Sequence, residues 1–317
     1  MFVCLVPACV VKGQDDGTQW AVVAVSDAFM RDEPRYGSEC VSQCRMGTLV
    51  QVLERKGYWA RVRTPEPYEG WVNELALAPT RALSAGEQKA TGLYGATLVP
   101  MGKKEADAYL AEPKLICLAP QVRVCDAPGG ETLTTLLMGN TVRSVKDGYQ
   151  DGWRQVTLPD GRKGWAPGRE LVPMEDWQLA EAEEDAATKA EDIIALAKSF
   201  LGCPYLWGGI SPGHFDCSGL VGFCFYMNGI QLPRDASQQV LCGIEVPVGE
   251  MIPGDLVFFG NSSVAHVAIY IGDGRIIHAS QLVRINSLDP GAPDYYGRNI
   301  LHVRRILGHH ITSIESE

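Results

Sequence analysis

Short apolar runs separated by Gly, Pro and Asp fill the first half of the chain, and one order of residues occurs twice. In 46–72 and again in 138–166, Met-Gly opens a strand, a turn follows, and Trp-x-x-Val leads through a Pro-containing turn to Gly-Trp. The tryptophans have the same spacing in both copies: Trp59 and Trp71, then Trp153 and Trp165. Strands of about four to six residues between tight turns are typical of small antiparallel barrels, so the repeat predicts two barrels.

A strand followed by an Asp- and Pro-containing turn precedes each copy, in 23–34 and in 119–128. With these strands the pattern resembles the bacterial SH3-like domains, over about 20–79 and 113–172. Because buried aromatic side chains dominate small cores, we expect the four tryptophans in the cores of the barrels. The alternative is that some of them line a groove for a peptide.

Residues 174–192 are rich in Glu and Ala and contain no Gly or Pro, which indicates a solvated helical linker. Apolar residues then recur at helical spacing in 193–201 and predict an amphipathic helix that ends at Gly202. A new domain is therefore expected to begin near residue 185.

A cysteine stands at the start of a second predicted helix, within 214–229. Apolar residues follow Cys217 at helical spacing until Gly229, and Asp216 and Ser218 can cap the first turn. A free thiol has a pKa of about 8.5, so only a few per cent of it is thiolate at neutral pH. The positive end of a helix and a nearby imidazolium both favour the thiolate, which makes Cys217 a candidate nucleophile.

Two histidines on consecutive predicted strands are candidate partners for this cysteine. Residues 264–272 are rich in β-branched side chains and predict a strand that contains His266. A tight turn at 273–274 follows, and the returning strand contains His278. In the simplest register, His278 lies near Ile269 rather than beside His266, so a bulge or a small register change is needed to bring the imidazoles together.

The second half of the chain resembles the NlpC-type papain-like cysteine peptidases over about 185–310. Five motifs support this resemblance: Tyr205-x-Trp207-Gly208-Gly209, Asp216-Cys217-Ser218-Gly219-Leu220, Pro253-Gly254-Asp255-Leu256, His266-Val267-x-Ile269-Tyr270-x-Gly272 and His278-Ala279. The resemblance implies that Cys217 attacks a carbonyl carbon and that His266 transfers the proton. It also implies that His278 orients His266, and that Tyr205 binds the oxyanion together with the backbone N–H of Cys217.

The predicted fold class is α+β: a papain-like catalytic domain, with helices on an antiparallel sheet, preceded by two small SH3-like β-barrels. The expected divisions are an N-terminal segment (1–19), a first SH3-like domain (20–80), a second with a connecting insertion (81–173), a helical linker (174–192) and the peptidase domain (185–312).

Two SH3-like domains before an NlpC-type domain resemble the γ-D-glutamyl-L-diamino-acid endopeptidases, also called dipeptidyl-peptidase VI. The resemblance implies that the partners are peptidoglycan stem peptides or muropeptides, cut after L-Ala-γ-D-Glu when the L-Ala amine is free. By the same resemblance, Asp216 and Asp235 contact the substrate backbone, and Ser218 holds the D-Glu carboxylate. A carboxylate of the first SH3-like domain, Glu69, is the candidate for binding the amine. The family often has a hydroxyl residue after the second of these aspartates, where this chain has Ala236.

Composition excludes some partners and cofactors. The net charge is −10 and Lys and Arg do not cluster, which argues against nucleic-acid binding. No run approaches the roughly 20 apolar residues of a transmembrane helix. The ten cysteines form no CxxC pair and no metal-ligand spacing with His, so we predict no metal and no other cofactor, while a disulfide stays open.

The first residues leave the compartment undecided. They form a short apolar stretch without the preceding basic residues of a signal peptide. Val6-Pro7-Ala8-Cys9 loosely resembles a lipoprotein cleavage box, which would indicate the cell envelope or periplasm. A first β-strand of a cytoplasmic protein is the alternative. The oligomeric state does not follow from the sequence.

The predicted function is therefore a cysteine endopeptidase of cell-wall turnover or recycling. One alternative is a non-catalytic wall-binding protein in which the SH3-like domains act and the site is vestigial. Another is an NlpC-type amidase or acyltransferase that acts on a substrate other than peptidoglycan. The sequence does not distinguish Lys from diaminopimelate at the third stem position, or intact wall from released fragments.

Overall fold

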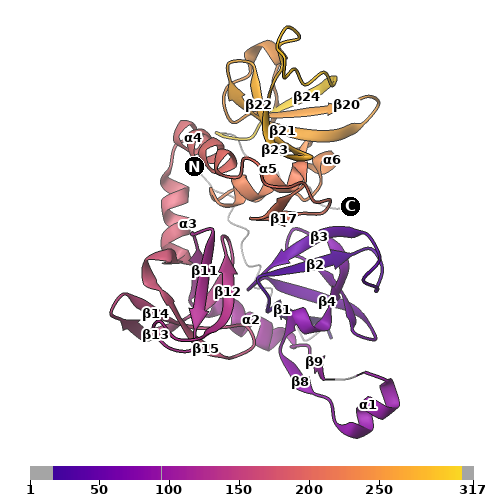
Figure 1. Ribbon diagram of the computed structural model, residues 1–317, viewed down its shortest axis with the longest axis vertical. Coiled ribbons are helices and arrows are strands. Elements are labelled where there is room, and N and C mark those ends of the chain that lie inside the picture. The colour runs from indigo at the N-terminus through magenta and orange to yellow at the C-terminus, as the bar shows by residue number, and fades with distance from the viewer. Residues whose placement is uncertain (1–16, 94, 309–317) are drawn as a thin grey trace. The chain divides into compact units, whose positions relative to one another are not determined.

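The structure is a computed structural model and describes residues 17–93 and 95–308. The chain divides into two compact units, one ending at Gln178 and the other beginning at Leu179. Figure 1 labels their elements. The resemblance to a lipoprotein cleavage box lies outside the described residues, as does most of the predicted N-terminal segment.

Seven antiparallel strands form the first barrel, in the order β3-β2-β6-β5-β4-β1-β7 (Figure 1). They are β1 (Gln19–Val23), β2 (Asp27–Arg31), β3 (Cys40–Arg45), β4 (Leu49–Lys56), β5 (Trp59–Arg63), β6 (Glu69–Asn73) and β7 (Leu77–Ala78), with the 3-10 helix η1 (Glu74–Ala76) before β7. Alternate side chains of a strand point to one face. Accordingly Ala60 and Val62 of β5 and Val72 of β6 are fully buried in one apolar cluster.

The second barrel repeats this topology strand by strand, in the order β12-β11-β15-β14-β13-β10-β16. Its strands are β10 (Lys114–Cys117), β11 (Gln121–Cys125), β12 (Thr132–Leu137), β13 (Thr141–Gln150), β14 (Trp153–Thr157), β15 (Lys163–Pro167) and β16 (Leu171–Pro173), with η2 (Gly168–Glu170) before β16. The register is repeated as well, because Arg31 pairs with Trp71 in the first barrel and Cys125 with Trp165 in the second. The repeat in the sequence is therefore a repeat of the fold.

An insertion lies between the barrels and consists of β8 (Thr80–Ala82), α1 (Ala85–Thr91), β9 (Ala96–Leu98) and α2 (Lys103–Ala111). Strands β8 and β9 form a hairpin of their own. The hydroxyl of Tyr109 in α2 is buried and donates a hydrogen bond to the carbonyl of Gly47, at 2.9 Å. This contact attaches the insertion to the first barrel.

The tryptophans of the repeat do not all lie in the barrel cores. Trp59 is buried, and the ring of Tyr36 meets it edge-on, with 5.0 Å between ring centroids. Trp71, Trp153 and Trp165 are only half-buried. The prediction that all four belong to the cores is therefore wrong for three of them. Alternation along β6, β14 and β15 gives the core positions to other residues: Val72, Val156 and Ala166.

The acidic segment after the second barrel forms two helices, α3 (Met174–Glu183) and α4 (Ala186–Ser199). The break comes from Asp185, whose carboxylate accepts hydrogen bonds from the backbone N–H groups of Ala187 and Thr188 and so caps α4. The helix that was expected over 193–201 thus begins earlier. The segment is also less solvated than predicted, because the ammonium group of Lys189 is buried against carboxylate and carbonyl oxygens.

A six-stranded antiparallel sheet forms the centre of the C-terminal unit, in the order β19-β24-β20-β21-β22-β23 (Figure 1). Its strands are β19 (Ile244–Glu245), β20 (Leu256–Gly260), β21 (Val264–Gly272), β22 (Arg275–Ser280), β23 (Leu282–Ser287) and β24 (Ile300–Arg305). The remaining elements are the hairpin β17 (Ile210–Ser211) and β18 (His214–Phe215), the helices α5 (Cys217–Tyr226) and α6 (Ala236–Gln239), and η3 (Val248–Glu250). Helix α5 packs against β21, β22 and α4.

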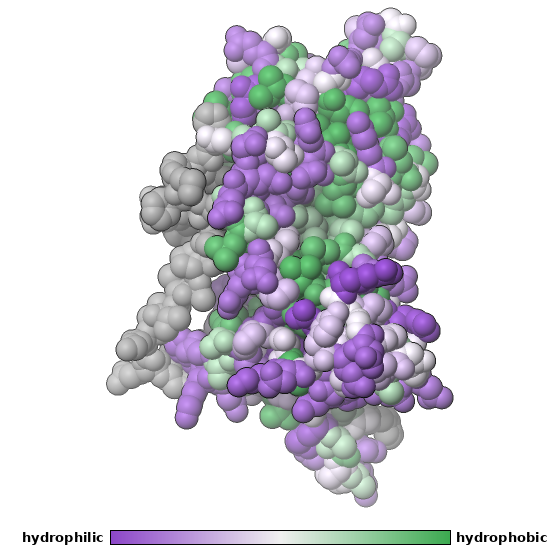
Figure 2. All heavy atoms as spheres, turned by 90° about the vertical axis from the view of Figure 1, so that its left-hand side faces the viewer, coloured by the Kyte–Doolittle hydropathy of each residue, from purple (hydrophilic) through white to green (hydrophobic). Residues whose placement is uncertain are grey.

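On the face drawn in Figure 2, the apolar residues form several small groups that are separated by polar residues. Among residues 17–93 and 95–308, no helix is both long and apolar enough to cross a membrane.

Candidate functional site

Helix α5 begins at Cys217 because the preceding residue caps it. Asp216 has extended backbone geometry, and its carboxylate accepts a hydrogen bond of 2.6 Å from the backbone N–H of Gly219. The rest of the helix is apolar and buried, since Leu220, Phe223 and neighbouring side chains pack beneath the sheet and against α4. This packing and the cap at Asp216 together fix the position of Cys217 at the N-terminus of the helix.

The carboxylate of Asp216 accepts five hydrogen bonds. Its Oδ2 accepts from Nη2 of Arg234 at 2.5 Å and from the backbone N–H of Gly208 at 3.0 Å. Its Oδ1 accepts from Gly219, from the hydroxyl of Ser218 at 3.2 Å and from Nη1 of Arg234 at 3.3 Å. Nη1 of Arg234 also donates to the hydroxyl of Ser218, at 3.0 Å. This buried network joins the loop before β17, the first turn of α5 and the segment before α6.

The sulfur of Cys217 lies against the strand that contains His266. Burial raises the pKa of the thiol, and the negative charge of Asp216 raises it further. The backbone N–H groups of Val267 and Ser218 donate to the sulfur and lower its pKa, and the charge of Arg234 lowers it as well. Burial outweighs these donors, so the thiol is neutral when the site is empty.

A bulge in β21 brings the two histidines onto one face of the sheet. Gly272 pairs with Arg275 next to the turn, but the register then shifts so that Ile269 pairs with Ile277. The shift is needed because a one-residue change of register moves a side chain to the opposite face. As a result, Nε2 of His266 lies 2.7 Å from Nδ1 of His278.

The hydrogen bonds of Asn286 fix the protonation of both rings. Its Nδ2 donates to the carbonyl of Asp294 at 2.6 Å, so its Oδ1 is the atom that accepts from Nε of Arg284 at 2.7 Å and faces Nε2 of His278 at 3.0 Å. Nε2 of a neutral His278 must therefore hold the proton, which leaves Nδ1 to accept from Nε2 of His266. The remaining nitrogen, Nδ1 of His266, is left with a lone pair and can act as a base.

Both imidazoles are neutral at physiological pH. Burial lowers the pKa of His266 to about 3, and the neighbouring His278 and Arg298 lower it further. Burial also lowers the pKa of His278 to about 4, although the hydrogen bond that His278 donates to Asn286 opposes this effect. Both imidazoles therefore keep these tautomers, with the proton on Nε2, across the neutral pH range.

Two tyrosines flank the cysteine and the histidines. Burial raises the pKa of Tyr205 to about 12, and the nearby Cys217 and Asp216 contribute, so its hydroxyl stays a proton donor. The ring of Tyr296 packs on both imidazoles, with 4.5 Å between its centroid and that of His278 and 5.5 Å to that of His266. Phe259 packs against the same tyrosine ring at 5.0 Å. These aromatic contacts keep the two imidazoles in place and away from water.

The structure brings together most of the residues singled out in the sequence, but not all. Ser218 lies in the Asp216 network, and Asp235 lies half-buried at the start of α6, where burial raises its pKa. Glu69 belongs to the other unit, on β6 of the first barrel. There its carboxylate forms ion pairs with Arg63 at 2.5 Å and Arg61 at 2.6 Å, and the hydrogen bond from Arg63 is the main cause of its lowered pKa.

Sequence reasoning missed three residues of this site: Arg234, Asn286 and Tyr296. Arg234 stands directly before Asp235 and could have been found as the cation that a buried aspartate at a helix start needs. Asn286 is eight residues from His278 on the next strand of a hairpin, and no sequence pattern marks it. Tyr296 lies in a loop whose path the sequence does not predict.

The described residues contain no group of three or more His, Cys, Asp or Glu side chains arranged to hold a metal ion. All cysteines within the described ranges are free thiols: Cys40, Cys44, Cys117, Cys125, Cys203, Cys217, Cys224 and Cys242.

Known families and proteins match both units. Residues 202–305 match the NlpC/P60 family, and residues 30–77 match the bacterial dipeptidyl-peptidase Sh3 domain. A γ-D-glutamyl-L-lysine dipeptidyl-peptidase of Bacillus cereus is 30% identical over 268 residues, which are 80% of this chain and 72% of the relative. Dipeptidyl-peptidase 6 of Lysinibacillus sphaericus is 30% identical over 284 residues, 87% of this chain and 94% of the relative. The chain belongs to the NlpC/P60 family.

The crystal structure of an NlpC/P60 family protein from Bacillus cereus has the same fold. Its TM-score is 0.68 at 23% sequence identity, and the match covers 91% of this chain and 99% of that one. The predicted α+β class, an NlpC/P60 fold after an SH3-like region, is thereby confirmed. The family resemblance that the motifs around Cys217 and His266 indicated is confirmed as well.

Proposed function

We propose that this NlpC/P60 chain is a cysteine endopeptidase that hydrolyses the bond between γ-D-Glu and the L-diamino acid of peptidoglycan stem peptides. The observation that supports it most is the hydrogen-bonded chain from Asn286 through His278 to His266, which ends at an unprotonated nitrogen. His266 lies on β21, the strand whose Val267 N–H contacts the sulfur of Cys217. Two relatives of comparable length are named as dipeptidyl-peptidases, one of them for γ-D-glutamyl-L-lysine.

The first chemical step is a coupled proton transfer and attack. Nδ1 of His266 removes the proton of the Cys217 thiol as the sulfur attacks the carbonyl carbon of the scissile amide. His278 stabilises the imidazolium that forms, because its Nδ1 accepts from Nε2–H of His266. The imidazolium then donates its proton to the leaving amine, and a water activated by the same histidine hydrolyses the thioester.

Negative charge develops on the carbonyl oxygen during both steps, and two donors are candidates to bind it. The backbone N–H of Cys217 is in the first turn of α5, where N–H groups have no partner within the helix. The hydroxyl of Tyr205 remains protonated because burial raises its pKa to about 12. Donors placed before the charge forms contribute about 10²–10³-fold each in comparable sites.

The substrate contacts follow from the charges of a stem peptide. A free L-Ala amine is a cation, and Glu69 and Asp235 are the candidate carboxylates for it. The half-buried carboxyl group of Asp235 would recover its lost solvation by pairing with the amine. Ser218 and Arg234 lie together at the start of α5 and can receive the D-Glu carboxylate. Asp216 has both oxygens engaged already, so we assign it a positioning role rather than a direct contact.

The test is cleavage of L-Ala-γ-D-Glu-L-Lys and of its diaminopimelate counterpart by the purified protein, followed by mass spectrometry. We expect L-Ala-γ-D-Glu and the free diamino acid, no products with Cys217→Ala, and slow cleavage of the N-acetylated peptides. Intact peptides in the presence of a titratable Cys217 thiol would rule out this function. Release of sugar-linked amide products or of transferred acyl groups would instead identify an amidase or an acyltransferase.

A further inference from the structure

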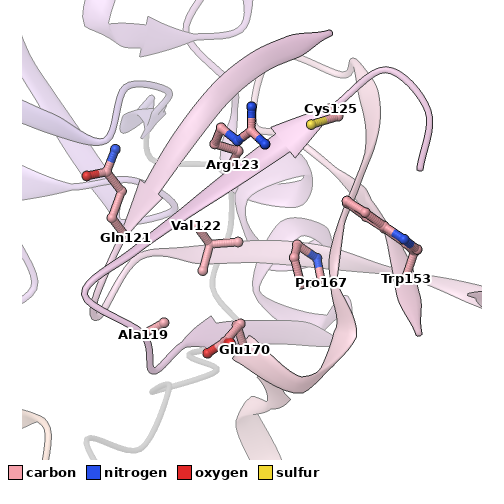
Figure 3. Close-up of a pocket in the computed structure, with 8 residues that line it drawn as sticks. All are labelled: Ala119, Gln121, Val122, Arg123, Cys125, Trp153, Pro167 and Glu170. Carbon is pink, nitrogen blue, oxygen red and sulfur yellow. The ribbon is translucent and has the colours of Figure 1, made fainter. Parts of the chain in front are cut away.

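A pocket in the second barrel has no role in the proposed hydrolysis (Figure 3). Its volume is about 230 Å³. Its lining comes from β11, β14, β15, η2 and the segment before β11: Ala119, Gln121, Val122, Arg123, Cys125, Trp153, Pro167 and Glu170. Figure 3 shows the indole of Trp153 and the ring of Pro167 on one side and Arg123 and Cys125 along strand β11.

The first barrel shows what fills the equivalent place. Trp59 pairs with Asn73 across β5 and β6, as Trp153 pairs with Pro167 across β14 and β15. In the first barrel both of these positions contact Tyr36: its ring lies edge-on to Trp59, and its hydroxyl accepts a hydrogen bond of 2.7 Å from Nδ2 of Asn73. A tyrosine side chain of the same barrel therefore covers this tryptophan.

The second barrel lacks the tyrosine because its loop is shorter. The loop between β2 and β3, residues 32–39, is closed by a backbone hydrogen bond from Asp32 to Glu39 at 3.1 Å. The loop between β11 and β12, residues 126–131, is closed by the equivalent bond from Asp126 to Glu131 at 3.0 Å. Two residues fewer separate the same two anchor points, and no aromatic residue lies between them.

The residue that ends the strand before this loop also differs between the two barrels. Arg31 ends β2, and its Nη1 holds the longer loop by donating to the carbonyl of Ser38 at 2.6 Å. The equivalent position at the end of β11 is Cys125, which lines the pocket and cannot make that bond. The loop and the residue that holds it thus differ between the barrels. The tryptophan that Tyr36 covers in the first barrel is nevertheless present in the second, as Trp153.

The pocket of the second barrel also has a charge that the first barrel lacks. Arg123 occupies the position of Phe29, and among the described residues its guanidinium forms no ion pair. Glu170, the acidic residue of the lining, is paired with Arg169 at 2.9 Å. A cation without a partner beside an aromatic wall suits a ligand that joins a ring to a carboxylate.

We propose that this pocket binds a tyrosine side chain of a peptide or protein partner, with a carboxylate next to it that pairs with Arg123. The ring would take the place that Tyr36 has in the first barrel, against Trp153 and Pro167. The pocket is the size of one side chain, below the roughly 300 Å³ at which sites for larger ligands begin, so binding of an isolated side chain is weak and its use is to position the partner.

The test uses the full chain containing 5-fluorotryptophan, with the fluorine resonance of Trp153 assigned by comparison with Trp153→Phe. N-acetyl-L-tyrosine should shift this resonance saturably and leave that of Trp59, which is already covered, unchanged. N-acetyl-L-tyrosinamide, which lacks the carboxylate, should bind about threefold more weakly, as expected for one partly exposed ion pair. A flat titration at Trp153 with N-acetyl-L-tyrosine overturns the proposal.

The variant Arg123→Gln separates the charge from the ring. Its side chain is exposed, so the variant should fold normally, bind N-acetyl-L-tyrosine about threefold more weakly and bind the amide as the parent does. Arg162→Gln, an exposed arginine of the same barrel outside the pocket, is the matched control and should change neither affinity. Equal binding of N-acetylglucosamine would identify a sugar site and contradict the proposal.

Discussion

Cys217 occupies the first position of α5, where the partial positive charge of the helix terminus favours a thiolate. That reasoning predicted an ionised sulfur beside an imidazolium. The directions of the pKa shifts point the other way, since burial raises the pKa of the thiol and lowers that of His266 to about 3. Burial outweighs the backbone donors to the sulfur, so we expect the ion pair to form only during the reaction.

We therefore expect Cys217 of the free enzyme to be alkylated slowly at neutral pH. The rate with iodoacetamide, followed by mass spectrometry of the peptide that contains Cys217, should rise with pH through a midpoint above that of an ordinary thiol. The sign follows from a raised pKa, because the reactive thiolate appears only as pH rises through it. His266→Ala should leave this midpoint nearly unchanged. A midpoint at about pH 6 or below would indicate a preformed ion pair.

Asn286 is the residue that decides which nitrogen of His266 is the base. Replacement by Leu leaves the buried N–H of His278 without an acceptor, which costs about 1–3 kcal/mol and corresponds to a loss in kcat of roughly 10- to 100-fold. KM should change little, since Asn286 acts through the histidines and not on the substrate. The measurement is kcat and KM for the stem peptide across pH.

The conservative variant Asn286→Asp keeps the accepting oxygen and should recover most of kcat. Its negative charge raises the pKa of His278, so the acid limb of the pH profile should move to higher pH. Asn299→Leu changes an exposed asparagine outside the network and serves as the control. Equal losses in both Asn286 variants, with unchanged pH profiles, would show that Asn286 has only a packing role.

At the scale of elements, the position of α5 depends on the buried pair of Asp216 and Arg234. Their side chains are 8% and 5% exposed, so neither charge is solvated when its partner is removed. We expect Arg234→Met to destabilise the C-terminal unit by about 3–5 kcal/mol, because it leaves a buried carboxylate uncompensated. Urea unfolding monitored through the C-terminal unit measures this loss.

The double variant Asp216→Asn with Arg234→Met removes both charges and should recover part of that stability. It should not recover activity, because Asn cannot bind the loop at Gly208 and the first turn of α5 as a carboxylate does. Arg162→Met is the control, since its ion pair with Asp160 is on the surface. If the stability losses of the two single variants simply added in the double variant, the two charges would not be coupled and the prediction would be wrong.

The elements of both units follow from patterns that the sequence contains. The repeat of Trp and Gly-Trp predicts two barrels, and the run after Cys217 predicts α5 at its true start. The face on which His278 lies was not predictable, because it depends on one bulge between Tyr270 and Gly272. The sequence indicates that such a bulge is needed for catalysis, but a bulge is decided by packing of the whole sheet, which no local pattern describes.

The C-terminal unit as a whole contains two histidines that are buried and neutral. Since their pKa values are lowered from 6.5 to about 3 and about 4, folding stability is full above pH 6.5 and falls as pH drops below it, where the unfolded chain binds protons first. Between pH 6.5 and 5, each histidine lowers the free energy of unfolding by on the order of 1–2 kcal/mol. Hydrogen exchange of the β21 and β22 amides should accelerate accordingly, and less so in His278→Gln. Equal pH dependence in both proteins would contradict this.

The L-Ala amine has two candidate partners, Glu69 of the first barrel and Asp235 of the C-terminal unit. Glu69 is an anion at neutral pH, because Arg63 and Arg61 lower its pKa further below that of an ordinary glutamate. Glu69→Gln should reduce kcat/KM for the free peptide by about 10- to 100-fold, the effect of one charge-assisted hydrogen bond, and leave the N-acetylated peptide unaffected. Glu54→Gln, an exposed position of the same barrel, should change neither value.

A fragment that begins at Leu179 provides the second measurement. It keeps the six-stranded sheet with its apolar cluster, and the ammonium of Lys189 keeps Glu181 and Asn228 as partners, so we expect it to fold alone. Without the barrels, the fragment should cleave free and N-acetylated peptides at similar, low rates. If the folded fragment still prefers the free amine by the factor seen in the full chain, the amine is bound by the C-terminal unit, with Asp235 as its carboxylate, and Glu69 has no part in specificity.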